Sequence, residues 1–217
     1  MAELTLTIPA KNLEAPESWG NRSQLKNMLT KIWNDYGKYI KKSEANSKIP
    51  AEIITSFIAV ESGGNPNAGG KGHITQGLMQ WNRTYAKAQL EDEYKQKRLT
   101  IGERDKLAEY GISFDKYGKT RVITNSDQLK PELNILIGSI LLGQLIDTKW
   151  GTENGKLRLD RVIAVYNAGA YGTTGKIARF DNTPTAYELS NKVNAISSAY
   201  IKKILGKNGA LDIATTD

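Results

Sequence analysis

Cysteine is absent from the 217-residue chain, and histidine occurs once, at His73. Disulfides and thiolate zinc sites are therefore excluded, and we interpret His73, within a glycine-rich stretch, as incidental. The longest apolar stretch, Ile135–Ile146, is interrupted by glycine and polar residues. No segment reaches the ~20 apolar residues of a membrane-spanning helix. We expect no transmembrane segment, no metal and no organic cofactor.

The N-terminus also lacks a basic region followed by an apolar one, so we expect no signal peptide. Lys and Arg total 30 against 23 Asp and Glu, a formal charge of +7. These charges are interleaved, as in Glu103–Lys106, rather than gathered in a block. Interleaving is typical of a solvated surface, and nucleic acid is not expected as a partner.

Helical periodicity dominates the chain, and its length suits one domain. Helices are predicted over Ser23–Ile40, from Pro50 to a stop at Gly63, and over Arg83–Lys97, Thr100–Tyr110, Pro131–Ile146, Leu159–Tyr166 and Thr183–Leu205. The fold class expected is mainly α, a single domain with an N-terminal helical extension.

The remaining segments predict breaks and loops. Ser43–Lys48 is a polar break, Ser113–Thr124 allows a short β-hairpin or an extended loop, and Gly169–Gly175 is a glycine-rich loop. We expect residues 1–46 to form the extension, 47–206 the catalytic domain and 207–217 a flexible tail.

Glu61 is the most informative residue, because it closes an apolar helix and precedes two glycines. A carboxyl at a helix C-terminus faces the negative end of the helix dipole, which disfavours ionisation. Apolar neighbours act in the same direction. Glu61 therefore suits a general acid, although a surface glutamate at a frayed helix end has the same sequence context.

Glycosidases usually need a second carboxylate. Glu52 is nine residues earlier in the same helix, and at about 100° per residue it lies on the opposite face. Asp160, Asp181 and Glu188 are candidates only if the fold brings them close, and each is also explained as a cap or solvated charge. A mechanism with a single acid is therefore considered as well.

Five short motifs occur in order along Ile49–Leu205, roughly three quarters of the chain. They are Glu61–Ser62 with the following Gly-Gly-Asn-Pro, Gly77–Gln80, Asn134–Ile135 with Gly138, Ala164–Gly169 and Tyr200–Leu205. In this order they resemble the motifs of soluble lytic transglycosylase domains. The resemblance implies a lysozyme-like, mainly α fold.

The resemblance also implies the chemistry and the partner, which are the glycan strands of peptidoglycan. In such enzymes one glutamic acid, here Glu61, protonates the oxygen of the bond between N-acetylmuramic acid and N-acetylglucosamine. Its carboxylate then takes the proton from the C6 hydroxyl, which attacks C1 and gives a 1,6-anhydro product. This internal nucleophile replaces the second carboxylate.

By the same resemblance, other motif residues contact the substrate or support Glu61. They are Ser62, Met79, Gln80, Tyr166, Asn167 and Tyr200. Tyr200 is expected to direct its hydroxyl at Glu61. Trp81 stands where the family usually has an aliphatic residue, and it either stacks on a sugar or fills the core.

Two other readings stay open: a goose-type muramidase that uses water, and a virion or secretion-apparatus component that binds glycan without cutting it. The stretch between Gln80 and Asn134 is about twice as long as in compact relatives. The helix Ser23–Ile40 lies outside the motifs and is predicted to dock on a virion or secretion-apparatus protein. Without a signal peptide, we expect a phage enzyme, carried in the virion or released at lysis, that acts in the periplasm or cell wall.

Overall fold

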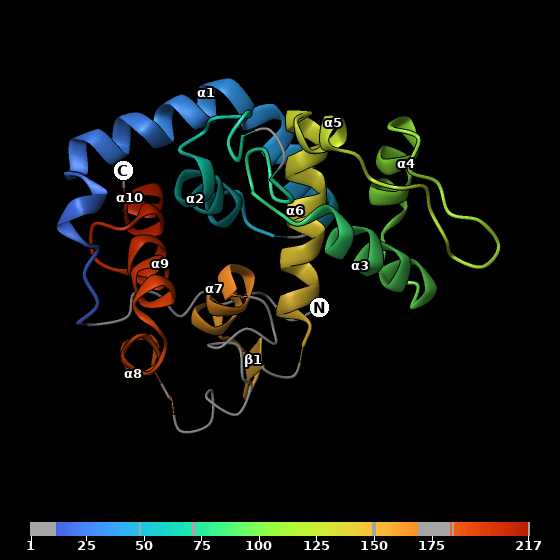
Figure 1. The fold of residues 1–217 in the computed structure, drawn as a ribbon. Coiled ribbons are helices and arrows are strands. Elements are labelled where there is room, and N and C mark those ends of the chain that lie inside the picture. Colours follow the sequence, from blue (N-terminus) through green and yellow to red (C-terminus); the bar gives the residue numbers. More distant parts are fainter. Residues whose placement is uncertain are drawn as a thin grey trace. The chain divides into compact units, whose positions relative to one another are not determined.

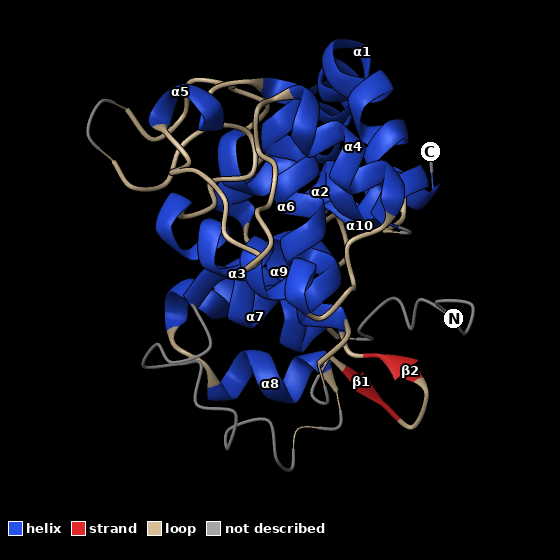
Figure 2. Ribbon diagram, turned by 90° about the vertical axis from the view of Figure 1, so that its right-hand side faces the viewer, coloured by secondary structure: helices blue, strands red, loops and turns tan. Residues whose placement is uncertain are grey.

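The structure is a computed structural model that describes residues 12–47, 49–70, 73–148, 151–168, 183 and 185–216. Within these residues it contains ten α-helices, one short 3-10 helix and one antiparallel strand pair (Figures 1 and 2). The predicted mainly α class is confirmed. None of the described helices has both the length and the apolar character that a membrane span requires.

The chain divides into two compact units, which are described separately. Unit 1 comprises Met1–Leu29 and Gln144–Asp217, and unit 2 comprises Thr30–Gly143. The elements are η1 (Glu17–Trp19), α1 (Arg22–Ser47), α2 (Ala51–Ser62), α3 (Arg83–Lys95), α4 (Ile101–Glu109), α5 (Asn125–Gln128), α6 (Pro131–Ile146), β1 (Thr152–Glu153), β2 (Lys156–Leu157), α7 (Leu159–Ala168), α8 (Ala186–Lys192), α9 (Ala195–Leu205) and α10 (Ala210–Thr216).

Unit 2 is built on two apolar helices, α2 and α6. Helix α2 begins after Pro50 and ends at Gly63, which adopts the left-handed conformation and donates its N–H to the Ala59 carbonyl at 3.0 Å. Both ends agree with the sequence prediction. Four large side chains of α2 and four of α6 are fully buried, which makes these helices the core of the unit: Ile53, Ile54, Phe57, Ile58, Leu133, Ile135, Ile137 and Leu142.

Helix α1 continues to Ser47, so the polar break predicted over Ser43–Lys48 is wrong for residues 43–47. The segment is polar, but Glu44, Ala45 and Asn46 are compatible with the exposed face of a helix. The Ser47 hydroxyl donates to the Ser43 carbonyl at 2.7 Å, within the last turn. Polarity alone therefore did not mark the helix end.

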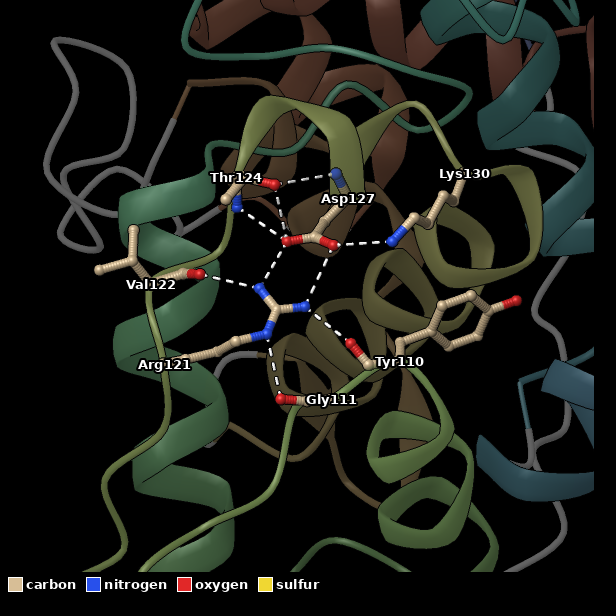
Figure 3. Close-up of polar contacts among 7 residues, drawn as sticks. All are labelled: Tyr110, Gly111, Arg121, Val122, Thr124, Asp127 and Lys130. Atoms are coloured by element: carbon tan, nitrogen blue, oxygen red, sulfur yellow. Dashed lines mark hydrogen bonds and ion pairs between the residues drawn. The ribbon is translucent and has the colours of Figure 1, made fainter.

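The segment of residues 83–130 is held by helix caps and by ion pairs, one of which joins Arg121 to the buried carboxylate of Asp127. Thr100 and Glu103 form the capping box predicted at the start of α4. Near the other end, the Arg121 guanidinium uses all five of its N–H groups: two bind the Asp127 carboxylate, at 2.6 and 3.1 Å, and three bind the carbonyls of Tyr110, Gly111 and Val122 (Figure 3).

Unit 1 is organised around α9, which packs against α7, α8 and α10. A single helix was predicted over Thr183–Leu205, but the chain forms α8 and α9 with a break at Val193 and Asn194. The Asn194 side chain accepts a hydrogen bond from the Ser197 N–H at 2.8 Å and caps α9. Apolar spacing continues across this break, so periodicity did not reveal it.

The C-terminal residues are not the flexible tail predicted for 207–217. Residues 210–216 form α10, and Ala210, Leu211 and Ile213 are buried. Arg22 at the start of α1 donates to Thr216 at 2.8 Å and pairs with Asp212. The Lys207 N–H also donates to the Leu13 carbonyl at 2.7 Å. The two ends of unit 1 are thus joined.

Of the two alternatives left open for Ser113–Thr124, the extended loop is confirmed, and the strand pair of the described residues lies at 152–157. Thr152 pairs with Leu157 and Glu153 with Lys156, whereas Ser113–Thr124 contains no strand and forms an extended loop apart from a turn at 115–118. The glycine-rich loop expected over Gly169–Gly175 lies outside the described residues. The division into 1–46 and 47–206, and the docking role of the first segment, stay predictions.

The burial of α10 gives a first prediction. Leu211 is fully buried, whereas Ile196 on α9 is 72% exposed. We expect Leu211→Ala to lower the free energy of unfolding by about 2–4 kcal/mol and Ile196→Ala to change it by less than about 0.5 kcal/mol. Urea denaturation measures both. Equal, small effects would mean that the C-terminal residues do not pack.

The Arg121–Asp127 pair predicts an acid-sensitive stability. Burial alone would raise the pKa of Asp127, but hydrogen bonds from Arg121, Thr124 and Lys130 outweigh it and hold this pKa well below its ordinary value. The stabilisation is therefore present above about pH 4 and is lost as the pH falls further.

We expect Asp127→Asn to be less stable than the parent at pH 7, by about 1–3 kcal/mol. This difference narrows as the pH falls below about 4. Melting temperatures between pH 7 and pH 2 provide the measurement, and Asp105→Asn, at an exposed position, is the control. A parent–variant difference that stays constant with pH would contradict this assignment.

Candidate functional site

Glu61 and Ser62 occupy the last turn of α2, and both are half-buried. The Ser62 hydroxyl donates to the Ile58 carbonyl at 3.0 Å and accepts from the Gly64 N–H at 3.2 Å. From α1, the Tyr36 hydroxyl donates to the Gly64 carbonyl at 3.3 Å. The backbone on which the Glu61 side chain stands is therefore fixed from its own helix and from α1.

The second motif, residues 77–80, is held by the side chain of Asn134 on α6. Asn134 is fully buried. Its Oδ1 accepts from the Met79 N–H at 2.8 Å, and its Nδ2 donates to the carbonyls of Gln76, at 3.0 Å, and Gln128, at 2.8 Å. One amide thus joins the motif loop, the end of α5 and α6, and it satisfies backbone groups that burial would otherwise leave unpaired.

Gln128 completes this network, and sequence reasoning did not identify it. Its side chain is fully buried, and Nε2 donates to the Trp81 carbonyl at 2.7 Å and to the Ile74 carbonyl at 3.1 Å. Gln128 lies in a polar stretch, so no periodic pattern distinguished it from a surface glutamine. Asn134 itself was noted only through the family resemblance.

Gly77 is required by the same network. Its φ is +85°, and a Cβ at this position would lie 2.3 Å from both the Asn134 Nδ2 and the Gln128 carbonyl oxygen. Any other residue would separate the loop from α6. The glycine that the resemblance identified thus has a packing reason in this chain.

Gln80 and Met79 follow in the same loop but differ in exposure. Gln80 is half-buried with φ +47°, and its Nε2 donates to the Gly77 carbonyl at 2.7 Å. Met79 is fully buried against Gly138, where an added Cβ would lie 2.4 Å from its sulfur. Of this pair, only Gln80 has an exposed portion that a ligand could reach.

Trp81 is a core residue, which decides between the two roles left open for it. It is 3% exposed, and its Nε1 donates to the Asn134 carbonyl at 2.9 Å. The His73 side chain is exposed, and its carbonyl accepts from Arg83 at 3.3 Å.

The other predicted site residues lie in unit 1. Tyr166 and Asn167 are half-buried near the end of α7, and Tyr200 is buried on α9. The Asn167 Oδ1 accepts from the Ser197 hydroxyl of α9 at 3.1 Å. The predicted site residues therefore form two sets, one in each unit. The roles predicted for the unit 1 set toward Glu61 stay predictions.

Two of the three candidate second carboxylates have structural partners. Asp160 is buried and accepts two hydrogen bonds from Arg158, at 3.0 and 2.8 Å. Glu188 belongs to the capping box of Thr185 at the start of α8. Asp181 lies outside the described residues. Within the described ranges, no three His, Asp or Glu side chains are grouped to hold a metal ion.

Comparison with known proteins gives a match in the part of the chain that contains Glu61 and Gln80. Residues 38–103 match the family model of the transglycosylase SLT domain. Among solved structures, the chain is similar to an inactive mutant of the lytic transglycosylase Slt from Pseudomonas aeruginosa, with a TM-score of 0.50 and 15% sequence identity. The likeness covers 82% of this chain and 23% of that one. No curated protein matches the sequence.

The class of fold is thus mainly α and lysozyme-like. The family match is more specific, because its range contains both Glu61–Ser62 and Gly77–Gln80. Residues 38–103 of the chain are therefore similar to the transglycosylase SLT domain. The chain spans about a quarter of the length of the transglycosylase that it resembles.

The Asn134 network predicts the effect of a minimal substitution. Asn134→Asp replaces an amide donor by a carboxylate oxygen, so the carbonyls of Gln76 and Gln128 lose their bonds. We expect the free energy of unfolding to fall by about 2–4 kcal/mol. Asn34→Asp, at an exposed position of α1, is the control and should change it by less than about 0.5 kcal/mol. Equal unfolding midpoints in the two variants would show that Asn134 does not hold the loop.

Proposed function

We propose that this protein is a peptidoglycan lytic transglycosylase that cleaves the β-1,4 bond between N-acetylmuramic acid and N-acetylglucosamine. The observation that carries the proposal is the SLT-domain match over residues 38–103. That range contains Glu61 at the end of a buried helix and Gln80 in a loop held by Asn134. General-acid cleavage of a glycosidic bond needs a carboxyl that is held in place. Glu61 meets this need because the backbone at the end of α2 is held by hydrogen bonds.

Glu61 acts first as the acid. The carbonyl end of α2 favours its protonated form, and the proton passes to the glycosidic oxygen as the bond from C1 to that oxygen breaks. The Glu61 carboxylate then accepts the proton of the C6 hydroxyl of the same muramoyl sugar. The C6 oxygen bonds to C1, so the product is a 1,6-anhydro sugar and no water is consumed.

The C6 hydroxyl takes the place that a second carboxylate or a water molecule has in other glycosidases. This division of roles agrees with Asp160 and Glu188, whose carboxylates are engaged in structural contacts. It requires one protein acid only, at Glu61.

The half-buried amide of Gln80 offers both donors and an acceptor to a sugar amide or hydroxyl group. Ser62 acts mainly through the turn, because its hydroxyl hydrogen is used within α2. Met79 supports the loop from below. Tyr166, Asn167 and Tyr200 are proposed to complete the site from α7 and α9.

Glu61→Gln tests the proposal, because glutamine keeps the size of the side chain and removes the acid. We expect the rate of peptidoglycan cleavage to fall by about 10²–10⁴-fold. Glu52→Gln is the matched control, since Glu52 is exposed on the first turn of the same helix and should cleave like the parent. Turbidity loss of purified cell walls measures the rate, and mass spectrometry identifies the products.

The expected muropeptides are lighter by one water than their hydrolysed counterparts. Products with a reducing-end muramic acid would instead identify a muramidase. No cleavage by the parent protein, together with retained glycan binding, would identify a non-catalytic glycan-binding protein.

A further inference from the structure

A cavity of about 560 Å³ lies in unit 2 beside the C-terminal end of α3. Its lining residues belong to α3 and the turn after it, to α4 and to the loop at residues 116–118. Figure 1 shows where these elements lie. The cavity is lined by four cations, two tyrosines, a leucine and a glycine: Lys95, Lys97, Arg104, Lys116, Tyr94, Tyr117, Leu99 and Gly118. None of the described residues that line it is acidic. We call it the cationic cavity.

The pairing of charges around the cationic cavity is uneven. Six other basic side chains of residues 83–130 form ion pairs: Lys87, Arg98, Lys106, Lys119, Arg121 and Lys130. Within the described part of the chain, the four cations of the cavity have no ion-pair partner. Every basic side chain of this segment thus has an acidic partner, except the four that line the cationic cavity and Arg83. Arg83 donates to the His73 carbonyl.

The wall formed by the loop is fixed in place rather than loosely attached. The Glu91 carboxylate of α3 is buried, and it accepts from the Lys119 Nζ at 2.8 Å and from the Thr120 N–H at 3.1 Å. Burial alone would raise the pKa of Glu91, but these bonds and one from Lys87 lower it to about 2. Glu91 therefore holds the loop as a carboxylate at any physiological pH.

Two further contacts set the shape of this wall. Gly118 lies so close to α3 that an added Cβ would be 2.8 Å from the Lys95 Cγ. At the end of the loop, Arg121 binds Asp127 and the carbonyls of Tyr110 and Gly111 (Figure 3). The cations are thus presented by a preorganised frame, and a hollow lined by charge of one sign concentrates its potential on an entering anion.

The chemistry of the lining selects among anions. Both types of side chain suit phosphate groups, since lysine binds phosphate as a point charge and the arginine fork matches its geometry. A stem peptide that carries amino groups beside its carboxylates would meet repulsion, because none of the described residues that line the cavity is acidic. The lining therefore suits a ligand whose charged groups are all negative.

The rings of Tyr94 and Tyr117 each make a contact within the protein. Tyr94 stacks on Phe114 with a centroid distance of 4.3 Å, and the Lys116 Nζ lies 4.9 Å from the centroid of Tyr117. The rings thus position the loop and one cation. We propose that the cationic cavity binds a polyol-phosphate chain of the cell wall. The choice of a wall polymer rests on the proposed function.

Binding of a fluorescently labelled poly(glycerol phosphate) tests this proposal. We expect the parent protein to bind it and the affinity to fall as salt rises. In the double variant Lys97→Gln with Arg104→Gln, we expect the dissociation constant to rise by at least about tenfold, because two phosphate contacts are lost. The matched control removes two lysines from the exposed face of α1, Lys38→Gln with Lys41→Gln, and should bind like the parent.

Each variant is first melted, and only variants that unfold at the parental temperature are compared. Equal binding by the cavity variant and the control would overturn the proposal. So would tighter binding of a single-stranded oligonucleotide or of polyglutamate than of poly(glycerol phosphate) with the same number of charges.

The assay separates this proposal from the proposed function. Binding of poly(glycerol phosphate) without any cleavage of cell walls would contradict the enzymatic activity and leave the cavity site standing. Cleavage of cell walls without binding of this polymer would overturn the cavity site alone.

Discussion

The buried amide of Asn134 is the contact on which the rest of the candidate site in unit 2 depends. Three hydrogen bonds from one side chain join α6 to the carbonyls of Gln76 and Gln128 and to the N–H of Met79. A fully buried amide whose donor and acceptor groups both bind the backbone is held in one arrangement. That arrangement fixes the Gly77–Gln80 loop, and with it the amide of Gln80.

A few side-chain contacts also hold two other parts of unit 2, the turn after Glu61 and the segment of residues 83–130. The turn after Glu61 is held by hydrogen bonds of Ser62 and Tyr36, so the acid stands at a helix end whose backbone is supported on both sides. The segment of residues 83–130 is held by contacts of Glu91 and Arg121. Four other cations of this segment line the cationic cavity. These frames suit the proposed cleavage of a glycan by Glu61 and the proposed binding of an anionic chain in the cationic cavity.

Sequence patterns predicted those features that depend on local interactions. The ends of α2 followed from Pro50 and Gly63, and the start of α4 followed from the Thr100–Glu103 capping box. The break before α9 and the packing of α10 were missed, because apolar spacing continues through Val193 and because burial of Leu211 is decided by tertiary contacts. Gln128 was missed for the same reason, since a buried glutamine and an exposed one look alike in sequence.

The proposed nucleophile is the C6 hydroxyl of the sugar itself, activated by Glu61. Digestion of purified peptidoglycan in water labelled with heavy oxygen, followed by mass spectrometry, distinguishes this nucleophile from water. We expect anhydro products that carry no heavy oxygen. Heavy oxygen at C1 of the released muramic acid would show that water attacks, which would contradict the proposed mechanism.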